Sequence, residues 1–161
     1  MNVKYLIIFS LAAFFALAGC GGSQQKSNEE ASASSPDNSL VADKPADADP
    51  KGIGKFRDVK LTHPLDEGMA KKGREISDVK CTSCHKLSEE KLVGPGWKGV
   101  TDRRTPEWIM NFITNVDEML DKDPEAQAML ELCMVRMPNQ NLNDEEARAV
   151  LEFMRKNDGK N

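Results

Sequence analysis

Hydrophobic and polar positions divide the 161-residue chain into three parts. The first is an apolar run from Tyr5 to Leu17, which a single Ser interrupts. A stretch with almost no large apolar residues follows and extends to about residue 61. From about Thr62 onward, apolar residues recur at the three- and four-residue spacing of amphipathic helices. The pattern therefore predicts one folded domain, preceded by two segments of a different kind.

Start signals divide the folded part into helices. The first helix is predicted to begin at Leu65 or Asp66 and to run towards Lys80. Residues 105–107 and 123–125 each combine a capping side chain, a proline at the first helical position and an acid in the first turn. Residues 143–146 open the last helix with the same polar chemistry.

Apolar residues from Trp108 to Leu120 keep to one helical face. No alternating strand pattern appears in the domain. The predicted class is therefore all-α, with about four to five helices.

The N-terminus has the features of an export signal. Lys4 precedes an apolar run that is too short to cross a bilayer, which takes about 20 residues. The run leads to Leu17-Ala18-Gly19-Cys20, which resembles the lipobox of bacterial lipoproteins. The resemblance implies removal of residues 1–19 and acylation of Cys20, which gives stable anchoring through two or three chains. A retained signal anchor is the alternative.

This prediction places the mature protein on the extracytoplasmic side of a bacterial membrane, in the periplasm. Gly21 stands where an Asp often signals retention at the inner membrane, so the outer membrane is mildly preferred.

Residues 20–61 are predicted to form a flexible, lipidated linker. They are rich in Gly, Ser, Asn, Asp, Pro and Ala, and such a composition buries too little surface to offset the entropy of ordering. About 40 residues of this kind span roughly 35 Å as a coil. Residues 53–61 either pack against the domain or continue the linker. The domain itself is assigned to residues 62–158, with a tail at 159–161.

Chemistry concentrates at Cys81-Thr82-Ser83-Cys84-His85, which has the Cys-x-x-Cys-His spacing of covalent haem attachment. In a helical turn, positions i, i+3 and i+4 share one face, so both thiols and the imidazole can point at one group. Two thiols can add to the two vinyl groups of haem, with His85 as the proximal iron ligand. We therefore predict one covalently bound haem c, which also enlarges the core of a small domain.

Residues 62–158 resemble a class I, monohaem cytochrome c domain. Gly73 lies eight residues before Cys81, and Phe153 lies in the last helix. In that family, a glycine and an aromatic residue at these places let the first and last helices cross closely. Ser77 departs from the aromatic residue that is usual before the attachment turn.

The same resemblance implies the remaining site residues. In Gly94-Pro95-Gly96-Trp97, the Pro95 carbonyl would accept the proximal imidazole N–H, and Trp97 would line the haem pocket. Met137, in the Met-Pro loop before the last helix, would be the distal iron ligand. Arg103 and Arg104 are candidates for a contact with a haem propionate, and the sequence does not choose between them.

Several alternatives stay open at this stage. Met134 or His63 is a chemically possible sixth ligand, and a five-coordinate iron would bind gases. Cys81 and Cys84 could bind zinc together with Cys133 and His63, although the usual second close pair of ligands is missing. A thioredoxin-like redox pair would need a βαβ context, which is not visible. Otherwise Cys133 is expected to be a buried small apolar residue.

Charge is uneven along the domain. Residues 62–104 hold nine Lys/Arg and seven Asp/Glu, a net charge of +2, whereas residues 105–161 hold six and twelve, a net charge of −6. The positive segment is either part of a mixed, solvated surface or a basic rim that steers acidic redox partners. The overall charge of −4 gives no case for nucleic-acid binding.

These features together predict a membrane-tethered monohaem cytochrome c. By its resemblance to the family, it would carry single electrons from a quinol-oxidising complex to a terminal oxidase or reductase. It is expected to be a monomer whose partners are redox proteins of the respiratory chain, without substrate turnover of its own. The alternatives are a haem-based sensor with a labile sixth ligand and a non-shuttling subunit of a larger respiratory complex.

Overall fold

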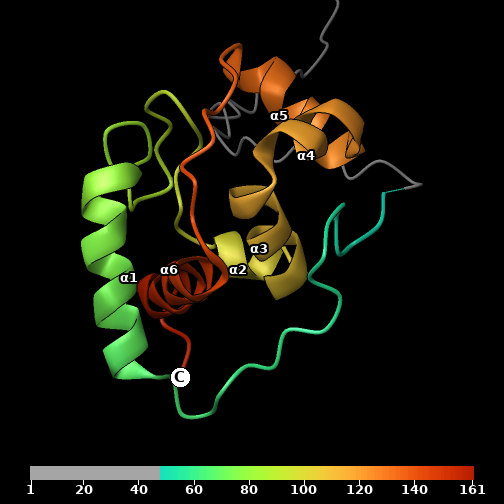
Figure 1. Ribbon diagram of the computed structural model, residues 1–161. Helices are drawn as coiled ribbons and strands as arrows, with labels where there is room; N and C mark the ends of the chain where they lie inside the picture. Colours follow the sequence, from blue (N-terminus) through green and yellow to red (C-terminus); the bar gives the residue numbers. More distant parts are fainter. Residues whose placement is uncertain (1–47) are drawn as a thin grey trace, which may run out of the picture. The chain divides into compact units, whose positions relative to one another are not determined.

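The computed structural model describes residues 48–161, and within this range the chain forms six α-helices and no strand (Figure 1). In chain order these are α1 (Glu67–Lys80), α2 (Val100–Arg103), α3 (Pro106–Thr114), α4 (Val116–Lys122), α5 (Pro124–Cys133) and α6 (Asp144–Asn157). The all-α prediction is confirmed. The predicted signal peptide, Cys20 and the linker up to residue 47 lie outside the described residues.

The four predicted helix starts are all observed, because each has local capping chemistry. The side chains of Asp66, Thr105 and Asp123 accept hydrogen bonds from backbone N–H groups in the first turns of α1, α3 and α5. At the start of α6, Asn143 and Glu146 form a reciprocal capping box. Helix α2, a single turn, has no such signal and was not predicted.

The apolar stripe from Trp108 to Leu120 belongs to two helices rather than one. Asn115 lies between α3 and α4 with φ −139° and ψ 48°, outside helical values. Its side-chain amide donates to Glu118 at 2.7 Å, the kind of local bond with which Asn competes against a continuous helix. Both halves of the stripe remain buried, so the hydrophobic pattern survives the break.

Helices α1 and α6 cross in close contact, with α6 seen nearly end-on beside α1 in Figure 1. A Cβ atom placed on Gly73 would lie 1.9 Å from the backbone oxygen of Ala149, so the backbones touch. Ser77 is fully buried and donates to the Gly73 carbonyl at 2.7 Å. The close crossing expected at Gly73 is therefore confirmed, with Ser77 in place of an aromatic side chain.

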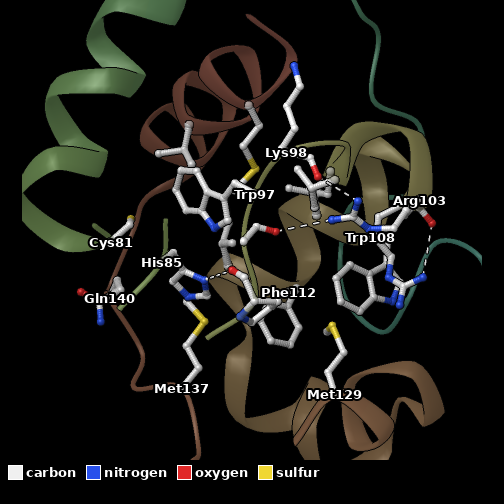
Figure 2. A pocket seen from close by; sticks show the side chains of 18 of the residues that line it. Cys81, His85, Trp97, Lys98, Arg103, Trp108, Phe112, Met129, Met137 and Gln140 are labelled. Atoms are coloured by element: carbon white, nitrogen blue, oxygen red, sulfur yellow. Dashed lines mark hydrogen bonds between the residues drawn. The ribbon is translucent and has the colours of Figure 1, made fainter. Parts of the chain in front are cut away.

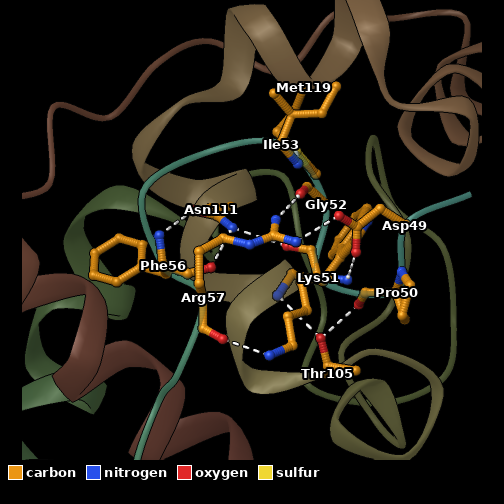
Figure 3. A network of polar contacts seen from close by, with 11 residues as sticks. Asp49, Pro50, Lys51, Gly52, Ile53, Phe56, Arg57, Thr105, Asn111 and Met119 are labelled. Carbon is orange, nitrogen blue, oxygen red and sulfur yellow. Dashed lines mark hydrogen bonds and ion pairs between the residues drawn. The ribbon is translucent and has the colours of Figure 1, made fainter.

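Residues 48–62, which we call the strap, pack against the helices (Figure 3). The side chain of Asn111 is fully buried under the strap, where it accepts from the N–H of Phe56 and donates to the carbonyls of Lys51 and Phe56. The N–H of Ile53 lies 3.0 Å from the sulfur of Met119. Residues 48–61, which the composition assigns to the linker, thus belong to the packed part of the chain.

Two glycines allow the strap to approach so closely. Gly52 has φ +64°, and a Cβ atom on it would lie 2.7 Å from the Met119 side chain and 2.9 Å from Trp108. A Cβ atom on Gly54 would lie 2.3 Å from the Asn111 amide oxygen. Of the two expectations for residues 53–61, packing against the domain is the one observed. Composition missed it because only a few apolar residues, Ile53, Phe56, Val59 and Leu61, pack against the core, and polar side chains of the helices, Asn111 among them, supply the remaining contacts.

Candidate functional site

A cavity of about 490 Å³ lies between the segment that follows α1, helix α3, the chain before α6, and α6 itself (Figure 2). Its volume is typical of a site for a small molecule or cofactor. Most of its wall is apolar, with contributions from α3 and α6. Seven of the predicted and candidate site residues line it: Cys81, His85, Pro95, Trp97, Arg103, Arg104 and Met137.

The attachment segment forms the helical turn that its spacing predicts. The N–H groups of Cys84 and His85 both donate to the Cys81 carbonyl at 3.0 Å, and Cys81 itself continues from α1 through a bond to Ser77. Cys81 is buried, and burial raises the pKa of its thiol. Cys84 is half-buried and is not part of the cavity wall.

The imidazole of His85 is held in one tautomer. Its Nδ1 atom lies 2.9 Å from the carbonyl oxygen of Pro95, and because a carbonyl only accepts, Nδ1 carries the proton. The other nitrogen then has a free lone pair for a metal. Burial lowers the pKa of His85, although the bond to Pro95 acts in the opposite direction. The neutral, ligand-competent form is therefore favoured.

Close packing holds the same ring in place. A Cβ atom on Gly94 would lie 2.3 Å from Cε1 of His85, so this position must be glycine for the ring to stay where it is. On another side, the rings of His85 and Trp97 are 5.7 Å apart, and Trp97 is 6.3 Å from Phe153. The predicted pocket-lining residue Trp97 is thus buried beside the imidazole.

Met137 is the predicted distal ligand, and its thioether points toward the His85 ring in Figure 2. Met134 is 84% exposed and lies in the left-handed region at the end of α5, outside the cavity wall. Two other methionines, Met129 and Met154, do line the cavity, although their sequence positions indicated only core packing. Figure 2 shows Met129 beside Phe112, away from His85.

The competing metal-site predictions find no support in the geometry. His63 is exposed, and its Nδ1 atom lies 2.8 Å from the backbone oxygen of Asn161, outside this cavity. Cys133 is half-buried at the end of α5 rather than buried in the core. Between residues 48 and 161, no three His, Cys, Asp or Glu side chains are grouped to hold a metal ion. The zinc alternative therefore has no site there.

The two candidate arginines have different partners. Arg104 pairs with the buried Glu125 at 2.9 Å, and its guanidinium lies 5.0 Å from the ring centre of Trp108. Arg103 is exposed and donates to the carbonyls of Lys98 and Gly96. Both line the cavity, so a propionate contact from either remains a prediction.

From the sequence, the apolar residues of the cavity wall are expected only to pack in the hydrophobic core. Ile109, Phe112 and Ile113 of α3, and Val150 of α6, all line the cavity. Periodicity shows which helix face is apolar, but it cannot distinguish a wall of a cofactor site from a contact between side chains. The cavity becomes apparent only once the helices are placed around it.

The residues present fit a covalently bound haem. One thiol, a neutral imidazole and a thioether line a single apolar cavity, and all three are groups that ligate or attach haem. Exposed charged side chains lie at its edge, with Lys98 and Arg103 available to carboxylates.

Within the described residues, no helix combines the length and the apolar character that crossing a membrane requires.

Comparisons with known proteins point the same way. The profile of the cytochrome c family matches residues 70–158. Cytochrome c from Rhodothermus marinus is 31% identical, with 69% of this chain and 98% of that chain covered and a TM-score of 0.66. An engineered cytochrome c from Rhodothermus marinus is 30% identical over 70% of this chain and 100% of its own, with a TM-score of 0.65. No match was found among curated proteins.

Proposed function

Because this chain belongs to the cytochrome c family, we propose that it carries single electrons from a quinol-oxidising complex to a terminal oxidase or reductase. One observation carries the proposal. His85, held in one tautomer by the Pro95 carbonyl, lines the same apolar cavity as the thioether of Met137. This pair of groups suits a haem that stays ligated on both sides while its charge changes.

Each residue has a separate task in this proposal. When bound, haem c would supply an iron that gains and loses one electron. Cys81 and Cys84 would hold the group by thioether bonds, and His85 would present its free nitrogen to the iron while the Pro95 carbonyl keeps the tautomer. Met137 offers a soft sulfur, which favours the reduced form. The apolar walls exclude water, so little reorganisation accompanies a change of charge.

The test is an absorption spectrum of the purified holoprotein with and without carbon monoxide. The proposal expects low-spin iron with a sulfur-to-iron charge-transfer band and slow binding of carbon monoxide to the ferrous form. Rapid carbon monoxide binding would instead favour a haem-based sensor with a labile sixth ligand. Stoichiometric co-purification with a membrane complex in mild detergent would favour a fixed respiratory subunit over a shuttle.

The proposal extends to a lipid tether at Cys20. The lipobox resemblance supports it, and the strap shortens the tether, because only residues 21–47 separate Cys20 from the packed chain. A coil of that length, which the composition predicts, spans roughly 30 Å. Such a tether would keep the haem domain within reach of respiratory complexes on the extracytoplasmic side of the membrane, with the outer membrane mildly preferred.

Fatty-acid labelling and the mass of the protein from cells that express Cys20→Ser test the tether. The variant should not incorporate labelled fatty acid and should keep residues 1–19, whereas the native chain should incorporate the label and lose these residues. Cys133→Ser is the matched control, because it removes a thiol far along the sequence and should behave like the native chain. A native chain that keeps its unprocessed mass and incorporates no labelled fatty acid would favour a signal anchor.

A further inference from the structure

Residues 134–141, which we call the distal loop, carry Met137 and have few attachments of their own. In the described part of the chain, no backbone–backbone hydrogen bond joins residues 135–141 to another segment. The bonds within the loop are local, from the Gln140 amide to the Pro138 carbonyl and from the Asn141 N–H to Asn139. Side chains must therefore hold the loop in place.

Two lysines reach this region from the proximal side of the cavity. Nζ of Lys80 donates to the carbonyl of Gln140, within the loop, at 3.1 Å, and Nζ of Lys91 donates to the carbonyl of Leu132, at the end of α5 directly before the loop, at 3.0 Å. Their acceptors lie on either side of Met137 in the sequence, 60 and 41 residues from the donors. Gln140 also lines the cavity, next to Cys81 in Figure 2.

The positions of the donors link the two sides of the site. Lys80 is the last residue of α1 and directly precedes Cys81, while Lys91 lies in the loop between His85 and Pro95. Both lysines are half-buried, and each charged donor bonds to a neutral carbonyl. Arg136 connects the distal loop to Asp121 of α4, on the distal side. Within residues 48–161, hydrogen bonds from the proximal side thus come from Lys80, which bonds to the loop itself, and from Lys91, which bonds to the end of α5 that leads into the loop.

We propose that Lys80 and Lys91 are positioning residues that hold the distal loop and the end of α5 that leads into it against the proximal side of the cavity, and so limit how often Met137 leaves the iron. The inference rests on the proposed function, since it takes Met137 as the distal ligand. Hydrogen bonds from charged donors are stronger than those between neutral groups, so two of them stabilise the closed loop appreciably. The two bonds have separate acceptors, and their effects should combine nearly independently.

Imidazole binding to the full-length ferric holoprotein tests the proposal. At high imidazole concentration the rate of loss of the sulfur-to-iron band becomes independent of imidazole and measures the opening of the distal position. Lys80→Ala and Lys91→Ala should each raise this limiting rate roughly three- to tenfold, and the double variant by about the product of the two factors. Lys80→Arg and Lys91→Arg keep a charged donor and should restore most of the native rate.

Lys72→Ala is the matched control, because Lys72 is exposed on α1 and has no hydrogen bond or ion pair within the described residues. If both alanine variants open at the rate of this control, the proposal is overturned even if they unfold at a lower temperature. The spectrum of the native protein separates a failure of the Met137 assignment from a failure of the role proposed for the lysines. A native protein without the sulfur-to-iron band overturns the assignment of Met137 itself, whereas a native band with unchanged opening overturns only the role of the lysines.

Discussion

Gly94 shows how a single missing side chain prepares the proximal ligand. His85 needs both a hydrogen-bond acceptor at Nδ1 and an unobstructed ring face, and the Gly94-Pro95 pair provides the two together. A neighbouring side chain would occupy the place of the imidazole, and the bond to Pro95 would then lengthen or break. The residue before the proline therefore contributes to ligand geometry although it carries no functional group.

Gly94→Ala should displace the imidazole of His85. The added Cβ atom would lie 2.3 Å from Cε1 and 2.8 Å from Nδ1, and relief of this overlap should destabilise the protein by about 2 kcal/mol or more. The absorption spectrum should show loss of low-spin iron, and denaturant unfolding gives the stability change. Gly68→Ala, where the nearest atom lies at 3.4 Å, should leave the spectrum unchanged. Native spectra for both variants would contradict this account of the ring position.

At the scale of elements, the crossing of α1 and α6 depends on one position. Gly73 is buried, and the backbone of Ala149 and Val150 occupies the space that a side chain would need. Gly68 lies on the same helix but is exposed. Both glycines are helical, but only Gly73 is packed against α6. Comparing alanine substitutions at the two positions therefore separates the effect of the helix crossing on stability from the effect of helix propensity.

Gly73→Ala should lower the free energy of unfolding by about 3 kcal/mol or more, since the helices must move apart to admit a methyl group. Gly68→Ala should raise it by up to about 1 kcal/mol, because alanine is the better helix former. Urea unfolding of the two variants checks both signs. A similar response from both positions would mean that the crossing is looser than the geometry indicates.

The strap is the element whose docking should depend on pH. The Glu107 carboxylate accepts the N–H of Val59 at 2.9 Å. Burial acts to raise the pKa of Glu107, but the N–H groups of Val59 and of Glu107 itself outweigh it, so the pKa is lowered. A lowered pKa means stability that is present above the unfolded pKa of about 4.3 and is lost as pH falls through the folded value.

Glu107→Gln should therefore cost up to about 1 kcal/mol of unfolding free energy at neutral pH. This difference between native and variant protein should shrink as the pH falls below about 4. Hydrogen exchange of the Val59 amide, measured across this range, reports the docking directly. Glu75→Gln, at an exposed position on α1, provides the control. A pH-independent difference would show that the carboxylate does not contribute through its charge.

The helices and the attachment turn could be predicted because their signals are local. Thr105, Asp123 and Asn143 cap the helices that follow them, and the Cys81–His85 spacing is itself a helical turn. The strap could not be predicted from composition, because much of its attachment comes from single polar side chains on the helices, such as Glu107 and the buried Asn111. The break at Asn115 depends in the same way on a side chain that is neutral in the hydrophobic pattern.

At the scale of the whole molecule, the charge at the cavity edge decides whether a basic rim steers redox partners, which the sequence suggests as one possibility. The exposed charged residues of the cavity wall are two acids, Glu89 and Glu90, and two bases, Lys98 and Arg103. Lys86 forms an ion pair with Glu90 at 2.6 Å. Six large apolar side chains are exposed within residues 48–161. Five of them lie in two segments, the loop between His85 and Pro95 and the end of α5 with the start of the distal loop: Leu92, Val93, Leu132, Met134 and Val135.

A cavity edge with balanced charge should show little electrostatic preference for redox reagents. We expect the rates at which ferricyanide, an anion, and tris(phenanthroline)cobalt(III), a cation, oxidise the ferrous holoprotein to change by no more than roughly threefold between low and high salt. Stopped-flow absorbance measures both rates. A ferricyanide rate that falls steeply with ionic strength, with an opposite trend for the cobalt complex, would instead support a basic rim. Glu89→Gln provides an internal calibration, because it leaves the edge with a net positive charge and should steepen the ferricyanide dependence.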